Sequence, residues 1–255
     1  MSDTLRVRVH QWTSGLDPAA NRARLADGVS SGADLVVFPE AFARDFGEAG
    51  SDVSGFAEPV DGPFARELAR VADAASCTAV AGMFEVADDP DRPYNTLVAA
   101  GASTATYRKI HLYDSFGYRE SDRITGGATE PVVVDVAGWQ VGLMTCYDLR
   151  FPELARRLVD AGAEVLVVPA AWLPGDRKVE HWRTLLAARA IENTCFVVGA
   201  AQPEPRYCGH SAVFGPMGEL LAEAAGGEAT IEATLDRDDL RATRRTNPSL
   251  ANRRL

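Results

Sequence analysis

The sequence lacks several features that mark whole classes of protein. No stretch approaches the roughly 18–20 apolar residues of a membrane-spanning helix, and the N-terminal residues have no apolar core of the kind found in a signal peptide. Positive charge is also short, with Lys+Arg at 26 against Asp+Glu at 36 and a formal net charge of −10. Because nucleic acids and anionic membranes require a cationic footprint, we expect neither as a partner. Because a membrane span and a signal peptide are both lacking, we expect a cytoplasmic protein.

Cysteine is scarce and shows no paired spacing. The cysteines Cys77, Cys146, Cys195 and Cys208 form no C-x-x-C pair, and no histidine lies at zinc-finger spacing from them. This argues against a disulfide framework and against a structural zinc site. Cys77 and Cys195 lie in apolar stretches, where a lone cysteine is usually an inert buried thiol, and Cys208 falls in an expected loop.

What the sequence does contain is the patterning of one α/β domain. Of 255 residues, 46% are hydrophobic and 24% are charged, which excludes a disordered or coiled-coil chain. Short apolar runs alternate with longer amphipathic stretches, as in layered α/β folds. No linker divides residues 1–255, so we expect a single domain. We expect its polar last segment, 236–255, to form no core element and to bridge to a partner subunit.

The alternation predicts the positions of strands and helices. Strands are expected at Leu5–Gln11, Asp34–Pro39, Thr78–Phe84, Asn95–Ala100, Val132–Val136, Val141–Thr145, Glu164–Val168, Phe196–Ala201, Ser211–Phe214 and Ala229–Leu235. Helices are expected at Pro18–Ser31, Pro63–Ala75, Phe151–Ala161 and Arg177–Glu192. Prolines lie near the start of three of these helices, where a missing N–H costs little.

Two segments resemble each other. GADLVVFPEA at Gly32–Ala41 and GAEVLVVPAA at Gly162–Ala171 share Gly-Ala, an acidic residue, an apolar strand and Pro-x-Ala. Because the order of the following elements repeats too, we favour two similar halves whose sheets face each other, with helices outside. The alternative is a chance match of a common local pattern. The first copy ends in Glu40 where the second has Ala170, and a buried strand-end carboxylate is costly unless it is used or paired.

Cys146 ends the apolar run VGLMTC a few residues before an expected helix. A strand-to-helix turn directs backbone N–H groups and the helix dipole at whatever binds there. Such a setting favours the nucleophilic thiolate. The alternative is a buried structural thiol.

Two further residues complete a set suited to acyl transfer. Taken alone, Lys109 in TYRKIHLYD would be an edge-strand lysine and Glu40 a solvated or ion-paired acid. A cysteine nucleophile, however, needs a proton acceptor, an acid for the leaving group and donors for the oxyanion. Glu40 can serve as base and then acid, while Lys109 can stabilise thiolate and oxyanion. The backbone N–H of Tyr147 would be the second oxyanion donor.

Glu40 within FPEA, Lys109 within RKIHLYD and Cys146 within CYDLRFPEL resemble the catalytic motifs of the nitrilase superfamily, the carbon–nitrogen hydrolases. The segments YNTLVAAG, HWRTLLAARAIENTCFVV and GHSAVFGPMGELLAE extend this resemblance over nearly the whole chain. The resemblance implies a four-layer αββα sandwich, a Glu-Lys-Cys triad of these residues, and no metal or other cofactor. It also implies a homodimer or larger homo-oligomer. Glu120 in YRESDRITGG would be the additional active-site glutamate of the family; its alternative is a solvated loop acid.

The residues after Cys146 indicate a branch of the family. Nitrile-hydrolysing members typically continue with Trp-Glu, whereas Tyr147-Asp148 stands here, similar to the amidases that act on ω-amides of small dicarboxylates and on deaminated glutathione. The loop before His181 and the segment 114–118 depart from that branch, which leaves the substrate open.

Such substrates carry a free carboxylate and therefore call for a cation. The candidates are Arg150, Arg177 and Lys178. Arg150 could instead pair with Asp148 or Glu153 at the helix start. Arg177 and Lys178 could be no more than a solvated pair on a loop.

The sequence thus predicts cysteine-dependent hydrolysis of a small carboxylate-bearing amide, releasing ammonia through a thioester acyl-enzyme. One alternative is a hydrolase of N-carbamoyl amino acids or simple aliphatic amides in the same family. Another is a Cys–His hydrolase using His111, His181 or His210, and a third is a metal-dependent hydrolase using His111 and Asp114. The last is a catalytically silent binding protein of the same fold.

Overall fold

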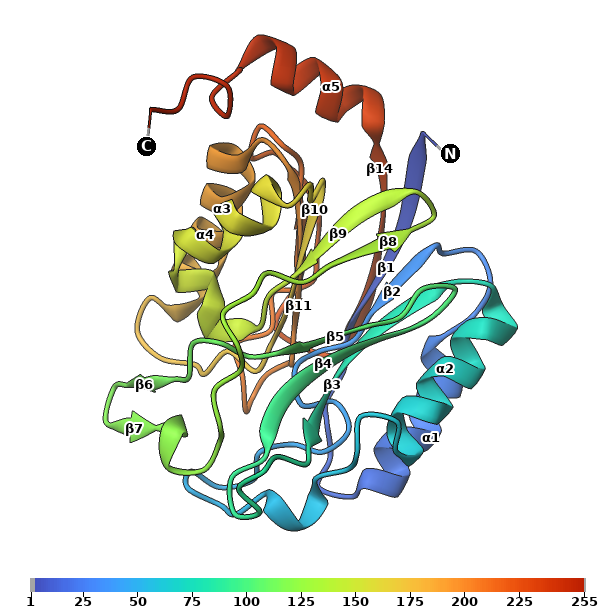
Figure 1. The fold of residues 1–255 in the computed structure, drawn as a ribbon, viewed down its shortest axis with the longest axis vertical. Helices are drawn as coiled ribbons and strands as arrows, with labels where there is room; N and C mark the ends of the chain where they lie inside the picture. Colours follow the sequence, from blue (N-terminus) through green and yellow to red (C-terminus); the bar gives the residue numbers. More distant parts are fainter. Residues whose placement is uncertain (1–2, 255) are drawn as a thin grey trace.

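The computed structural model describes residues 3–254 and places them in four layers (Figure 1). Two sheets face each other. Helices α1 (Pro18–Gly28) and α2 (Pro63–Ala75) cover the outer face of the first sheet, and α3 (Pro152–Asp160) and α4 (Lys178–Asn193) cover the second. The predicted αββα sandwich is confirmed. The ends of the expected domain, at residues 1, 2 and 255, lie outside the described residues.

Each sheet has six strands. The first has the order β14-β1-β2-β3-β4-β5 and the second β13-β12-β11-β10-β9-β8. The strands of the first are β1 (Thr4–Gln11), β2 (Leu35–Val37), β3 (Thr78–Glu85), β4 (Tyr94–Gly101), β5 (Ala105–Arg108) and β14 (Ala229–Asp236). Those of the second are β8 (Val133–Val136), β9 (Trp139–Leu143), β10 (Val165–Ala170), β11 (Phe196–Ala201), β12 (Ala212–Phe214) and β13 (Leu220–Glu223).

The two halves have equivalent topology. In the first, β1, β2 and β3 are parallel and are flanked by antiparallel neighbours. The second repeats this with β9, β10 and β11. The two similar sequence segments carry β2 and β10, the central parallel strands of their sheets. The interpretation as two pseudo-symmetric halves is therefore confirmed.

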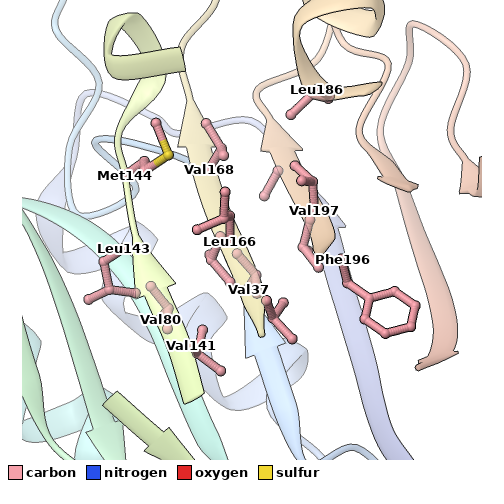
Figure 2. Packing of buried hydrophobic residues seen from close by; sticks show 14 of the residues in the cluster. Val37, Val80, Val141, Leu143, Met144, Leu166, Val168, Leu186, Phe196 and Val197 are labelled. Atoms are coloured by element: carbon pink, nitrogen blue, oxygen red, sulfur yellow. The ribbon is translucent and has the colours of Figure 1, made fainter. Parts of the chain in front are cut away.

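The core fills the space between the sheets. Figure 2 shows Val37 and Val80 of the first sheet in one cluster with Val141 and Leu143 of the second. On β2 the intervening residue, Val36, faces the other way and joins the cluster under α1 and α2. Parallel strands buried on both faces read as continuous apolar runs, which is why these segments carried the clearest signal in the sequence.

Shorter elements surround one end of the sandwich. They are a hairpin of β6 (Asp114–Ser115) and β7 (Tyr118–Arg119) and the 3-10 turns η1 (Ser54–Phe56), η2 (Glu120–Asp122) and η3 (Cys146–Arg150). Within residues 3–254, no helix has the length and apolar character needed to cross a membrane.

The C-terminal segment corrects one expectation. Residues 236–255 were expected to form no core element, yet they contain helix α5 (Arg237–Thr246), whose Leu240 is buried in the central cluster. Asp236 caps the helix, and Arg244 donates to the carbonyl of Thr194. A single leucine on a polar helix gives too weak a periodic pattern to predict a buried helix from the sequence. Packing of the helix against the sandwich stabilises it instead. Its bridging to a second subunit stays a prediction.

Candidate active site

Three loops that follow strand ends meet at one cavity. Glu40 lies just beyond β2, Lys109 directly follows β5, and Cys146 begins η3 just beyond β9. All three line a cavity of about 170 Å³, and Glu120 joins them from η2. The structure therefore brings together the residues that the sequence placed in one catalytic set.

The ammonium of Lys109 lies between two carboxylates. Lys109 Nζ is 3.1 Å from Glu40 Oε1 and 2.8 Å from Glu120 Oε2, and all three side chains are at most 3% exposed. Buried ion pairs need further hydrogen bonds to offset desolvation. Here the backbone N–H of Tyr113 donates to Glu120 at 2.6 Å, and that of Ala171 donates to Glu40 at 2.7 Å. Glu120 is therefore a buried partner of Lys109 and not a solvated loop acid.

The backbone after Glu40 fixes where this carboxylate lies. Ala41 has a φ of 53°, in the left-handed region that L-residues seldom adopt. The side chain of Gln202 donates to the carbonyl of Glu40 at 3.0 Å. A Cβ at Gly82 on β3 would lie 2.4 Å from the nitrogen of Ala41, so only glycine allows this close approach.

Cys146 occupies a sharp turn with a φ of 46° and is 7% exposed. Burial and the negative charge of Glu40, which also accepts a hydrogen bond from the thiol, raise the pKa of Cys146 well above its usual range, although Lys109 lowers it. The sequence favoured the thiolate, whereas the buried site holds two carboxylates for one ammonium, an arrangement that disfavours a further negative charge on sulfur.

Lys109 remains a cation in this environment. Burial by itself lowers the pKa of Lys109, but the charges of Glu120 and Glu40 raise it well above its ordinary value of 10.5. A lysine ammonium can only donate hydrogen bonds, as stabilisation of an oxyanion requires. Tyr147 also lines the cavity, directly after Cys146, and the role of its backbone N–H stays a prediction.

Asp148 holds the turn that carries the nucleophile. Its buried carboxylate accepts hydrogen bonds from the backbone of Thr145 at 2.9 Å, the hydroxyl of Tyr107 at 2.6 Å and the backbone of His111 at 3.0 Å. The sequence suggested Asp148 as an ion-pair partner of Arg150, but no ion pair between them occurs within the described residues. Its oxygens are already committed to this network.

The groups offered by the alternative mechanisms lie outside the cavity. The ring of His111 contacts Asp148, and Asp114 accepts a hydrogen bond from Ser121. Neither these residues nor His181 and His210 are among the lining residues. Within residues 3–254, no group of three or more His, Cys, Asp or Glu side chains is arranged to hold a metal ion.

Two of the cations suggested for a substrate carboxylate reach the cavity, and one does not. Arg150 and Lys178 line it. Arg177 is not among the lining residues; its side chain is 63% exposed and pairs with Glu180 at 2.5 Å. It serves as the N-cap of α4 in a left-handed conformation, which turns Lys178 inward and leaves Arg177 outside.

Arg150 and Lys178 carry charges that no carboxylate within the described residues neutralises. Arg150 lies 4.9 Å from the ring centre of Trp172, and its buried Nε has no hydrogen-bond partner there. Lys178 donates to the hydroxyl of Tyr113 at 3.2 Å and lies 4.1 Å from the ring of Phe116. Burial and the neighbouring charge of Arg150 lower the pKa of Lys178. The cavity is therefore lined by two positive charges without a carboxylate partner within the described residues.

The sequence did not indicate the aromatic residues that line the cavity or the asparagine beside the two glutamates. Tyr113, Trp172 and Tyr207 line the cavity. Asn95, which is not among the lining residues, donates hydrogen bonds to both Glu40 and Glu120. Trp172 follows the end of the second similar segment, as Phe42 follows the first, so its position near a strand end could have been read from the repeat. Asn95 lies in the segment YNTLVAAG, where nothing in its spacing indicates a role.

Comparison with known families identifies the chain. The family model for carbon–nitrogen hydrolase matches residues 6–245, a span that includes Glu40, Lys109 and Cys146. The chain belongs to the carbon–nitrogen hydrolase family. The resemblance to the nitrilase superfamily and the assignment as a hydrolase of carbon–nitrogen bonds are therefore confirmed.

Relatives of this carbon–nitrogen hydrolase are similar over nearly their whole length. The deaminated glutathione amidase of Escherichia coli O157:H7 is 41% identical over 233 residues, covering 90% of this chain and 88% of that protein. A CN-hydrolase superfamily protein of Xanthomonas campestris, with an arsenic adduct in its active site, is 28% identical with a TM-score of 0.89, covering 100% and 98% of the two chains. A mutant of the amidase from Nesterenkonia sp. AN1 is 28% identical with a TM-score of 0.78, covering 98% and 97%. In it, the acetamide moiety of fluoroacetamide is covalently added at the active-site cysteine.

Proposed function

We propose that this enzyme hydrolyses the amide bond of a small, carboxylate-bearing substrate through a thioester on Cys146. The observation that carries the proposal is the arrangement of Lys109 between Glu40 and Glu120, beside a thiol whose proton Glu40 can accept. The covalent adduct at the active-site cysteine of the Nesterenkonia amidase supports the same role for Cys146.

The reaction begins with transfer of the Cys146 proton to Glu40 as the sulfur attacks the amide carbon. The carbonyl π electrons move to oxygen, where Lys109 and the backbone N–H of Tyr147 stabilise the charge. The C–N bond then breaks, and Glu40 gives its proton to the departing ammonia or amine. Water next loses a proton to Glu40 and adds to the thioester, and the C–S bond breaks to release a carboxylic acid and the protonated thiol. Glu120 orients Lys109 throughout.

Arg150 and Lys178 would bind the carboxylate of the substrate. An anionic group in contact with buried Lys178 and half-buried Arg150 would accept charge-assisted hydrogen bonds, which are stronger than those between neutral groups. The relatives named deaminated glutathione amidase support this substrate class, because deaminated glutathione carries free carboxylates. The aromatic side chains of Tyr113 and Trp172 would contact the carbon chain between the two ends.

Lys178 offers a direct test of this substrate class. Lys178→Met is expected to lower kcat/KM for carboxylate-bearing amides by about 10- to 100-fold, chiefly through KM, because a hydrogen bond to a charged group contributes roughly 1.5–3 kcal/mol. Hydrolysis of acrylamide, which has no carboxylate, is expected to change little. The measurement is ammonia release with both substrates. Arg177→Met is the matched control, since it removes the adjacent exposed cation.

A substrate panel tests the proposed function itself. Ammonia release would be compared for α-keto-acid ω-amides, deaminated glutathione, aliphatic amides, N-carbamoyl amino acids and nitriles, with detection of the free amine for deaminated glutathione. We expect the carboxylate-bearing amides to be preferred. Preference for neutral amides or for nitriles, or equal losses in Lys178→Met and Arg177→Met, would contradict the assignment.

A homodimer or larger homo-oligomer remains a proposal from the resemblance, and a cytoplasmic location remains a proposal from the sequence features described above. Light scattering of the purified enzyme tests the first of these, with a mass of 27.3 kDa expected for a monomer. A monomer at micromolar concentration would contradict it.

A further inference from the structure

Asn95 is a buried polar side chain that the proposed reaction does not use. It lies on β4 and is 1% exposed. Its Nδ2 is 2.8 Å from Glu40 Oε1 and 3.3 Å from Glu120 Oε1. Its backbone carbonyl accepts the N–H of Lys109 at 2.8 Å. One residue therefore contacts all three charged members of the site, which come from three separate segments of the chain.

The chemistry of the carboxylates fixes the orientation of the amide. Ionised carboxylates only accept hydrogen bonds, so the NH₂ group of Asn95 must face them. Its Oδ1 has no partner within the described residues. The hydrogen bonds of this side chain are therefore the ones that its NH₂ group donates to Glu40 and Glu120. Lys109 alone supplies one positive charge to two carboxylates, and Asn95 adds two donors without adding a charge.

We propose that Asn95 is a positioning residue that holds Glu40, Glu120 and Lys109 together and keeps the carboxylate of Glu40 facing Cys146. The inference rests on the proposed function, in which Glu40 accepts the thiol proton. A hydrogen bond donated to a carboxylate favours its charged form. Without this donor, the negative charge of the two carboxylates is less well stabilised.

The experiment compares Asn95→Ala with Thr96→Val. Thr96 is the adjacent residue on β4, is fully buried, and donates to the carboxylate of Glu85 on the opposite face of the strand at 2.8 Å. The rate at which iodoacetamide alkylates Cys146 would be followed by intact-protein mass against pH, together with kcat/KM. In Asn95→Ala the acid limb of both profiles is expected to move up by about one pH unit, which lowers both rates by up to about tenfold on that limb. In Thr96→Val neither limb is expected to move.

A second variant keeps the test decisive if Asn95→Ala does not fold. Asn95→Asp has the same shape but places a third carboxylate beside Glu40 and Glu120. Its alkylation rate relative to the wild type is expected to fall as the pH rises, because a protonated Asp still donates one hydrogen bond and an ionised one repels both neighbours. For Asn95→Ala the corresponding ratio rises with pH.

The inference would be overturned if the alkylation rates of the folded variants relative to the wild type did not change with pH. Equal shifts of the acid limb in Asn95→Ala and Thr96→Val would overturn it too. Failure of the proposed function gives a different result. In that case the wild-type enzyme turns over no amide of the panel, while the alkylation profiles still report whether Asn95 acts through Glu40.

Discussion

Replacing Cys146 with alanine is expected to lower amide turnover by about 10⁴-fold or more and to abolish the covalent adduct. Loss of a nucleophile removes the covalent route, and only binding and oxyanion stabilisation remain. Intact-protein mass spectrometry of the wild-type enzyme mixed rapidly with substrate should show the added acyl group. Cys146→Ala should show none, and its thermal unfolding should remain cooperative.

Cys77→Ala is the matched control for this experiment. Cys77 is also buried, burial raises the pKa of its thiol, and it packs under the helices of the first sheet, away from the cavity. The variant should retain both turnover and adduct. An adduct that persists in Cys146→Ala, or that disappears in Cys77→Ala, would contradict the assignment of the nucleophile.

Replacing Lys109 with methionine is expected to damage both catalysis and folding. Loss of one oxyanion donor lowers rates by about 10²- to 10³-fold. The variant also leaves Glu40 and Glu120 buried without their cation, and removal of one partner of a buried ion pair typically costs about 3–5 kcal/mol of unfolding free energy. Kinetics with the preferred amide and urea denaturation of the purified variant measure the two effects.

The stability loss in Lys109→Met should depend on pH in a defined direction. Because the pKa of Lys109 is raised in the folded enzyme, its contribution to stability is fully present below its ordinary pKa of 10.5 and is lost only as the pH rises through the raised value. At neutral pH the variant therefore lacks the whole contribution. Its two unpaired carboxylates can be relieved by protonation, so the deficit relative to the wild type should shrink as the pH falls.

Arg108→Met is the control for Lys109→Met. Arg108 is the preceding residue, and its half-exposed guanidinium pairs with Glu85 outside the cavity. Because Glu85 is buried while Arg108 is half-exposed, this variant should lose some stability but less than Lys109→Met, and it should remain close to the wild type in activity. Equal stability of Lys109→Met and the wild type at neutral pH would contradict the central role of the ammonium.

Several parts of the fold and the site were predictable from the sequence because each depends on local patterning. The parallel strands stand out as apolar runs. Glu40 and Cys146 carry reactive groups just beyond the ends of two of these strands. Lys109 follows a strand that was recognised only as a short alternating run. The similar segments Gly32–Ala41 and Gly162–Ala171 indicated two halves, since the order of the elements that follow them also repeats.

Other features depend on neighbours that are distant in sequence. Arg177 and Lys178 are adjacent and both cationic, yet the left-handed backbone at the start of α4 turns one out to solvent and the other into the cavity. Leu240 is a single leucine on a polar helix, and it becomes part of the core only because the sandwich offers a surface to cover.

The sequence by itself determined the family and the layered fold, and it predicted the three residues of the catalytic set. The family follows from the resemblance of three motifs to the nitrilase superfamily, and the layered fold follows from that resemblance together with the internal repeat. Only the tertiary structure decided that the pKa of Cys146 is raised and that Asn95 connects the three charged residues. Protonation depends on burial and on charges contributed by other segments, and those distances exist only once the two sheets have packed face to face.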